Sequence, residues 1–240
     1  MKIFSDWIGE GIGRKDKVNS LRLMRNSVYL RIYLPILWSR FSKDSNSKKF
    51  NVLDIFLKVF PSPRSHKLKM KTIRQLGGTK AWVETGTYVG DGAMAISQFA
   101  EVLHTIEPSR ELSDIAKQKL IGIGNVEIHV GTSEVILSEI LESLVANGCY
   151  DICFWLDGHY SGGETFSGET ATPIKSELET IANYLKCFTN LRIMIDDVRC
   201  FNPKIPDYKF YPKIQYLLDY AKLHKFSILF TRDICIMKKS

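Results

Sequence analysis

The feature that most constrains the fold is a regular alternation of strand-like and helix-like segments from residue 81 onward. Short apolar runs are followed by stretches with the three-to-four-residue periodicity of helices. The runs that predict the first five strands are 81–84, 102–106, 126–130, 150–156 and 191–195. The helices are expected at 67–76, 93–99, 111–120, 134–146, 173–185 and 211–224. Strands that alternate with helices form a mostly parallel, doubly wound α/β sheet.

The end of the chain departs from this alternation. The apolar runs 226–230 and 234–237 are separated only by Thr231-Arg232-Asp233, with no room for a helix between them. This spacing predicts a hairpin and therefore an antiparallel edge. We expect a seven-stranded, mostly parallel sheet that ends in an antiparallel strand pair.

Positive charge is concentrated in the first third of the sequence. Residues 1–80 contain 18 Lys and Arg against 5 Asp and Glu, a net charge of +13 in a chain whose total is +7. We therefore expect a basic, helical N-terminal extension over residues 1–75 and one α/β domain over residues 76–240. A basic extension is typical of contact with an anionic membrane, a nucleic acid or an acidic glycan. The alternative is a solvated basic face.

The segment 28–38 is the most hydrophobic part of this extension. It is interrupted by Arg31 and Pro35 and is too short to span a bilayer, which takes about 20 apolar residues. It is interpreted either as a helix packed on the core or as a segment lying in a membrane interface.

The cysteines indicate a reducing compartment. None of the five forms a CxxC pair, and Cys153 and Cys235 lie inside apolar strand-like runs. The first residues include Asp6 and Glu10, which argues against a signal peptide. We expect a cytoplasmic protein, with peripheral contact to the inner face of a membrane as the further hypothesis.

Two acidic clusters follow apolar runs directly. Asp157 follows the run 153–156, and Asp196 and Asp197 follow the run 193–195. In an open α/β sheet the ligand crevice lies at these carboxyl ends. Three carboxylates that converge there repel one another unless a cation or a proton lies between them, so the pattern predicts a divalent metal site. The alternative is a set of strand-end caps and salt bridges, with Asp197 paired to Arg199.

A glycine-rich turn follows the first strand. A dinucleotide fingerprint would read GxGxxG here, but this chain has Glu84 at the strand end, followed by Gly86 and Gly90. A carboxylate at this point suits a ligand with a cationic amino-acid end better than a pyrophosphate. Glu107 ends the second strand, where it is placed to accept hydrogen bonds from two ribose hydroxyls. The alternatives are a surface acid for Glu84 and a helix N-terminal charge for Glu107.

Over roughly residues 80–240, this pattern resembles class I S-adenosylmethionine-dependent methyltransferases. The resemblance implies that the glycine-rich turn holds the methionine end of S-adenosylmethionine, that Glu107 holds the ribose, and that the segment 131–133 flanks the adenine. The implied cofactor-binding residues are Glu84, Gly86, Thr87, Tyr88, Gly90, Glu107, Thr132, Ser133 and Asp157.

The acidic clusters carry a second resemblance. Asp157, Asp196 and Asp197 resemble the metal triad of catechol O-methyltransferase-like enzymes, although those enzymes have Asp-Asn where this chain has Asp-Asp. The segments 156–160, 172–174 and 177–178 are similar to the cephalosporin hydroxylase and sugar O-methyltransferase branch, which includes rhamnosyl methyltransferases. The resemblance implies an O-methyltransferase, assisted by Mg²⁺, that acts on a hydroxyl of a sugar, glycan or other small polar acceptor.

Asp157 and His159 are the predicted catalytic residues. Hard oxygen ligands suit Mg²⁺, and a bound Mg²⁺ lowers the pKa of an acceptor hydroxyl that it chelates. His159 is predicted to take the proton, because an imidazole titrates near neutrality. A metal ligand or a hydrogen-bond partner are the alternatives for His159. The polar, glycine-rich segment 160–170 is expected to be a substrate-side loop.

Other functions remain as alternatives. They are a metal-independent methyltransferase acting on another nucleophile, a nucleic-acid methyltransferase and a non-catalytic binding module. The sequence has no Asn/Asp-Pro-Pro-Tyr/Phe motif, which argues against the base N-methylating form of a nucleic-acid methyltransferase, and nucleic acid is not the expected partner. The missing GxGxxG argues against a nicotinamide oxidoreductase. The sequence gives no indication of the oligomeric state.

Overall fold

The computed structural model describes residues 65–158, 172–202, 205, 208 and 210–239. Outside these ranges lie the basic extension before residue 65 with its segment 28–38, the predicted base His159 and the whole loop 160–170. The helices are α5 (His66–Gly77), α6 (Asp91–Ser97), α7 (Arg110–Lys119), α8 (Ser133–Ala146), α9 (Ile174–Tyr184), the short 3-10 helix η2 (Val198–Phe201) and α10 (Ile214–Leu223). The strands are β1 (Ala81–Thr85), β2 (Val102–Glu107), β3 (Val126–Val130), β4 (Asp151–Leu156), β5 (Asn190–Ile195), β6 (Phe226–Thr231) and β7 (Ile234–Lys239).

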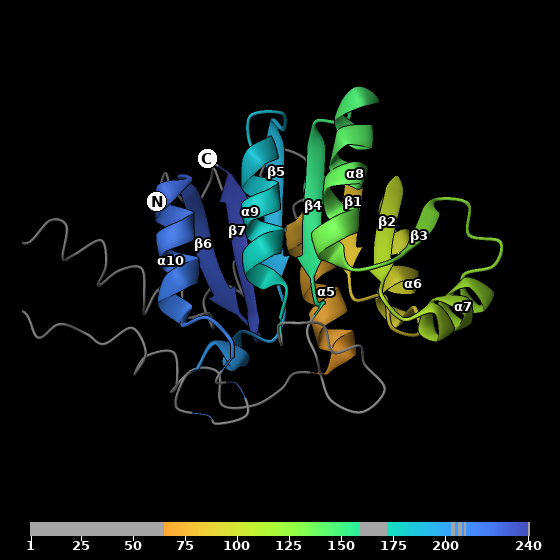
Figure 1. Cartoon of the computed structure of the whole chain (residues 1–240), viewed down its shortest axis with the longest axis horizontal. Helices are drawn as coiled ribbons and strands as arrows, with labels where there is room; N and C mark the ends of the chain where they lie inside the picture. The colour runs from red at the N-terminus through yellow and green to blue at the C-terminus, as the bar shows by residue number, and fades with distance from the viewer. Residues whose placement is uncertain (1–64, 159–171, 203–204, 206–207, 209, 240) are drawn as a thin grey trace, which may run out of the picture.

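The strands form one seven-stranded sheet in the order β3-β2-β1-β4-β5-β7-β6 (Figure 1). The first five strands pair in parallel, whereas β7 runs antiparallel to both β5 and β6. The predicted sheet and its antiparallel ending are confirmed. Because the strand order reverses between β1 and β4, the carboxyl ends of these two strands form the switch point at which such sheets bind ligands.

Helices cover both faces of the sheet. Figure 1 shows α8, α9 and α10 on the face toward the viewer, with α5 and α6 behind the strands. Alternate residues of β4 enter the two cores, so that Phe154 packs toward α8 and α9 while Trp155 packs toward α5 and α6. Burial of a large apolar side chain stabilises the folded chain by roughly 1.5–3 kcal/mol. The central strands are therefore stable, and they hold the residues at their ends in place.

Helix α5 packs against the sheet. It includes residues on both sides of residue 75, where we expected the N-terminal extension to end. Met70, Ile73 and Leu76 join the core on the face that α6 covers. Gly78 ends the helix in the left-handed conformation that commonly terminates helices. The packing fixes the orientation of α5, and with it the direction of its one buried lysine, Lys69.

The cysteines are free thiols, and Cys153, Cys200 and Cys235 are buried. Within the ranges that the structure describes, no helix combines the length and apolar character needed to cross a membrane.

Candidate active site

The glycine-rich turn lies directly against the chain that follows β4. Gly86 N and Thr87 N donate hydrogen bonds to Ile106 O at 3.0 and 3.2 Å, which holds the turn on β2. Gly86 has a φ of 85°, and a Cβ added to it would lie 2.5 Å from Asp157 O. Any side chain at residue 86 would therefore separate the turn from Asp157.

Glu84 is buried at the end of β1. Its side chain accepts a hydrogen bond from Thr105 Oγ1 at 2.7 Å. A Cβ on Gly92 would lie 2.2 Å from Glu84 Oε1, so the first turn of α6 passes immediately over the carboxylate. Burial raises the pKa of Glu84 to about 8. Glu84 is thus no surface acid, and a cationic ligand group beside it would favour the ionised form.

Glu107 ties the glycine-rich turn to the connection after β2. Its Oε2 accepts a hydrogen bond from Tyr88 N at 2.7 Å, and its Oε1 accepts one from Ser109 N at 3.0 Å. Tyr88 has a φ of 51°, in the left-handed region, so the carboxylate helps to hold a backbone conformation that is unfavourable in itself. Each carboxylate oxygen keeps a further lone pair for a ligand.

The third part of the predicted cofactor site lies at the end of β3. Gly131 N donates to Glu107 O at 3.0 Å, which places the ends of β2 and β3 side by side. Thr132 is the N-cap of α8 and Ser133 is its first residue. The structure therefore places the predicted cofactor residues at the carboxyl ends of β1, β2 and β3, with Gly90 at the start of α6 and Asp157 after the adjacent strand β4.

The three predicted metal ligands follow two neighbouring strands, β4 and β5. Asp196 N donates to Leu156 O at 3.0 Å, so the ends of β4 and β5 are held together. Burial raises the pKa of Asp157 well above its usual range, and the charges of Asp196 and Asp197 raise it further. Burial and the charge of Asp197 likewise raise the pKa of Asp196 to about 6, against the opposing effect of Lys69.

Two basic side chains lie among these acids. Lys69 Nζ donates to Asp196 Oδ2 at 2.7 Å and also contacts Asp197 Oδ1. Arg199 Nη2 donates to Asp197 Oδ2 at 2.7 Å, and Nη1 bridges Asp197 and Asp233. The remaining oxygen, Asp196 Oδ1, accepts from Asp197 N at 2.7 Å. The pairing of Asp197 with Arg199, given above as an alternative, is thus present.

Lys69 supplies a permanent positive charge at this point. Burial alone would lower the pKa of Lys69, but the two aspartates outweigh burial and the net shift is upward. The carboxylate oxygens have the chemistry that Mg²⁺ prefers. In this arrangement, however, the ammonium group of Lys69 contacts both Asp196 and Asp197, and Arg199 contacts Asp197. These cations would repel Mg²⁺ at short range, so the two residues do not fit Mg²⁺ unless Lys69 withdraws.

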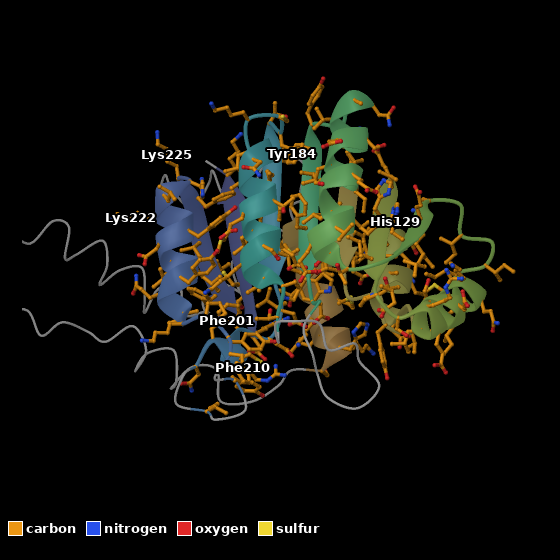
Figure 2. All side chains as sticks on the ribbon, viewed as in Figure 1. His129, Tyr184, Phe201, Phe210, Lys222 and Lys225 are labelled. Carbon is orange, nitrogen blue, oxygen red and sulfur yellow. The ribbon has the colours of Figure 1, made fainter. Side chains whose placement is uncertain are left out.

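A pocket opens beside the acids. It is narrow and partly open, and its empty space amounts to about 230 Å³ with open solvent included. Its lining includes Thr172, Ile174, Glu177, Asp196, Phe201 and Tyr211. Figure 2 labels Phe201 at this end of the sheet, in η2 just after β5.

Glu177 is a polar residue of this pocket for which the sequence predicted no role. It is 1% exposed, and within the described part of the chain its Oε1 has no hydrogen-bond partner. Burial raises the pKa of Glu177 to about 7. A Cβ on Gly158 would lie 3.3 Å from Glu177 Oε1, so the glycine leaves space in front of the carboxyl group.

The fold is that of class I S-adenosylmethionine-dependent methyltransferases. It has their strand order, their antiparallel last strand and a candidate ligand site at the carboxyl ends of the parallel strands. One solved structure with this fold is assigned as a caffeoyl-CoA O-methyltransferase from Staphylococcus aureus. It has 17% sequence identity and a TM-score of 0.51, and the match covers 87% of this chain and 98% of that one. At this identity the similarity shows the fold alone.

Two further solved structures match with lower TM-scores. One is an O-methyltransferase from Bacillus cereus in complex with SAH, at 17% identity and a TM-score of 0.49, covering 83% of this chain and 94% of that one. The other is assigned as a methyltransferase, comes from Streptococcus mutans and is also in complex with SAH; it has 14% identity, a TM-score of 0.46 and coverage of 75% and 99%. No protein-family model matches the sequence, and no curated protein matches it.

Proposed function

We propose that this chain is an S-adenosylmethionine-dependent O-methyltransferase that methylates a hydroxyl of a sugar, glycan or other small polar acceptor. The observation that carries the proposal is the close approach of Gly86 to Asp157 O. It joins a cofactor half, at the ends of β1 to β3, to an acidic acceptor half, at the ends of β4 and β5. Methyl transfer requires the donor and the acceptor to meet across such a boundary.

In the cofactor half, the proposed role of Glu84 is to bind the α-amino group of S-adenosylmethionine. A buried carboxylate whose pKa is about 8 gains most from a cationic partner. Glu107 is proposed to accept hydrogen bonds from the ribose hydroxyls while it holds Tyr88 N. Thr132 and Ser133 are proposed to flank the adenine, since they follow β3 beside Glu107.

In the acceptor half, the pocket offers groups that suit a hydroxylated substrate. Among the residues that the structure describes, Glu177 Oε1 is buried without a hydrogen-bond partner, and leaving such a group unsatisfied costs about 1–3 kcal/mol. A substrate hydroxyl that donates to it would recover this energy. As the methyl group moves from sulfur to the acceptor oxygen, that oxygen must lose its proton, and Asp157 lies at the junction to orient the hydroxyl. His159 stays a prediction as the final proton acceptor.

The role of a metal separates two forms of this proposal. The Mg²⁺-assisted form is suggested by Asp157, Asp196 and Asp197, whose carboxylate oxygens are ligands of the type that Mg²⁺ prefers. Bound Mg²⁺ would lower the pKa of the acceptor hydroxyl. The geometry favours the metal-independent form, because Lys69 contacts Asp196 and Asp197 where Mg²⁺ was predicted. In that form the ammonium group offsets the negative charge of the two aspartates and keeps them in place beside the pocket.

The experiment uses the full chain, methyl-labelled S-adenosylmethionine and a panel of sugars and polyols, with parallel samples in EDTA and in Mg²⁺. Methylation of a hydroxyl that persists in EDTA supports the metal-independent form. Methylation that requires Mg²⁺ supports the other form. A chain that binds no S-adenosylmethionine in either sample contradicts the proposal as a whole.

We also propose peripheral contact with an anionic membrane. The support is the net charge of +13 over residues 1–80. Co-sedimentation with anionic liposomes at low salt, but not with neutral ones, is the expected result. Equal recovery with both kinds of liposome would contradict this part of the proposal.

A further inference from the structure

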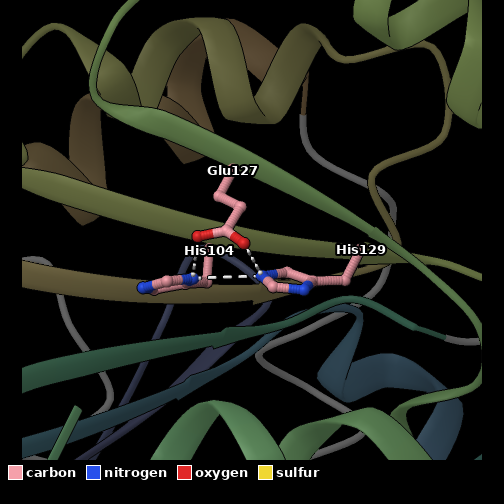
Figure 3. Close-up of side chains that lie close together, drawn as sticks. All are labelled: His104, Glu127 and His129. Atoms are coloured by element: carbon pink, nitrogen blue, oxygen red, sulfur yellow. Dashed lines mark hydrogen bonds and ion pairs between the residues drawn. The ribbon is translucent and has the colours of Figure 1, made fainter. Parts of the chain in front are cut away.

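A group of two histidines and one glutamate lies on the outer strands of the sheet, apart from the site described above. His104 belongs to β2, and Glu127 and His129 belong to β3, the strand at the edge of the sheet. In the parallel register, His104 is opposite Glu127 and Ile106 is opposite His129. Since side chains two residues apart share a face of a strand, all three side chains lie on one face. Figure 3 shows them pointing toward a common centre.

The distances among their ligand atoms match those of a tetrahedral metal site. His104 Nδ1 lies 3.0 Å from His129 Nε2 and 3.4 Å from Glu127 Oε2. His129 Nε2 lies 3.8 Å from Glu127 Oε1. Two ligand atoms that each bind zinc at 2.0–2.1 Å in tetrahedral geometry are about 3.3–3.4 Å apart. Shifts of a few tenths of an ångström would therefore complete a three-ligand set.

The ligand types and their exposure narrow the choice of ion. Two imidazoles and one carboxylate suit Zn²⁺, whereas Mg²⁺ prefers sites made of oxygen ligands alone. The side chains of His104 and His129 are 12% and 22% exposed, while that of Glu127 is 64% exposed. The group is thus anchored in the sheet and open to solvent on the side of Glu127, where water can take the fourth position.

We propose that His104, Glu127 and His129 form a binding site for one Zn²⁺ ion that links the edge strand β3 to β2. The site lies outside the proposed cofactor and acceptor halves, so the ion takes no part in methyl transfer. The proposed effect of the ion is structural. It would hold β2 against β3, and these strands lead to Glu107 and to Thr132 of the proposed cofactor site. A bond between these strands stabilises the edge of the sheet on which the nucleoside half of the proposed cofactor site is built.

The competing interpretation is a hydrogen bond between the two imidazoles, with no ion. One ring nitrogen would donate and the other would accept at the observed 3.0 Å. This arrangement also holds β2 against β3, but it gives no response to zinc. The two interpretations therefore differ in a measurable quantity, the stabilisation of the folded chain by Zn²⁺.

The test is thermal unfolding of the full chain, without a histidine tag and after treatment with EDTA, at increasing Zn²⁺. At a free Zn²⁺ concentration 100 times the dissociation constant, a chain of this size should gain roughly 5–10 °C in melting temperature. Calorimetry should find one ion per chain, and Co²⁺ in place of Zn²⁺ should give the visible absorption of a tetrahedral site. Excess Mg²⁺ should not compete.

The variants are His104→Asn, His129→Asn and Glu127→Gln, with His66→Asn as the matched control. His66 is exposed at the start of α5 and far along the chain from the group. The control should keep the full zinc response, both histidine variants should lose it, and Glu127→Gln should weaken binding at least tenfold. Glu127 is exposed, so its variant tests the site even if a histidine variant fails to fold. No zinc response in the unmodified chain, or an equal response in all variants, would overturn the proposal.

Discussion

Lys69 Nζ donates a hydrogen bond of 2.7 Å to Asp196 Oδ2, across 127 residues of sequence. The contact joins the helix before the first strand to the acids after the fifth. The sequence indicates that acidic side chains gather at these strand ends and need a cation. In this structure, Lys69 of the same chain supplies that positive charge. Whether methyl transfer needs Mg²⁺ then depends on whether Lys69 holds its place.

Replacement of Lys69 by Met should expose this dependence. The variant leaves two buried aspartates without their cation, and breaking a buried ion pair costs about 3–5 kcal/mol. We expect a lower melting temperature, a large loss of activity in EDTA and partial recovery of both when Mg²⁺ is added. Lys67→Met is the control, since Lys67 is exposed on the same helix. A Lys69→Met chain that is as stable and active as the control would contradict the proposed role.

Gly86 and Gly122 offer a matched pair for testing the close approach of the turn to Asp157. Their φ angles are 85° and 84°, but a Cβ on Gly86 would lie 2.5 Å from Asp157 O, whereas one on Gly122 meets nothing within 4 Å. Gly122→Ala should lose only about 1–2 kcal/mol, the cost of a left-handed residue. Gly86→Ala should lose more in the free energy of unfolding, and should weaken S-adenosylmethionine binding. If denaturant unfolding gave both variants the same loss in the free energy of unfolding, the turn would not lie in close contact with Asp157.

Glu107→Ala should weaken the cofactor half in particular. It removes the acceptor for Tyr88 N and Ser109 N, each held at 3.0 Å or less. Hydrogen bonds to a charged group contribute about 1.5–3 kcal/mol each, so we expect at least a tenfold rise in the dissociation constant for S-adenosylmethionine. Calorimetry measures the change directly. Glu111→Ala, at an exposed position early in α7, serves as the control.

The raised pKa of Glu84 should make the free energy of unfolding fall as the pH rises. Its pKa is about 8 in the folded chain, against an ordinary value of 4.5, because burial disfavours the charged form. Between these values the folded chain keeps a proton that the unfolded chain has lost, so the free energy of unfolding decreases with rising pH. Glu177, with a pKa of about 7, acts in the same direction.

Glu84→Gln should reduce this pH dependence between about pH 4.5 and 8, because the amide does not titrate. In the absence of ligand the variant should be more stable than the unmodified chain at pH 8. It should also bind S-adenosylmethionine more weakly, since the proposed partner of the α-amino group is lost. Melting temperatures across pH measure the first effect. An unchanged slope would mean that Glu84 is ionised in the folded chain at neutral pH.

The sheet was predictable from the sequence because its signals are local. Strand β3 has the predicted bounds, and the hairpin of β6 and β7 follows from the three residues between two apolar runs. Helix η2 was missed, since four residues are too few to show a period. The position of Asp196 and Asp197 at a strand end was likewise readable, because each strand end is marked by a change from apolar to acidic residues.

Other features depend on contacts that the sequence does not display. The basic helix 67–76 was predicted, but which of its lysines enters the acidic cluster is decided by how α5 packs on the sheet. The burial of Glu177 depends on the same kind of packing, between α9 and the ends of β4 and β5. The group of His104, Glu127 and His129 depends on the register of two parallel strands, which no turn between them fixes.

The most direct test of the central claim is calorimetry of S-adenosylmethionine binding to the full chain, first in EDTA and then in Mg²⁺. We expect one molecule bound per chain with the same affinity in both, because the cofactor half lies on β1 to β3 and Lys69 already supplies the cation of the other half. Asp157→Asn should keep most of this affinity while it abolishes methyl transfer. Absence of binding under both conditions would contradict the proposal that this chain is an S-adenosylmethionine-dependent methyltransferase.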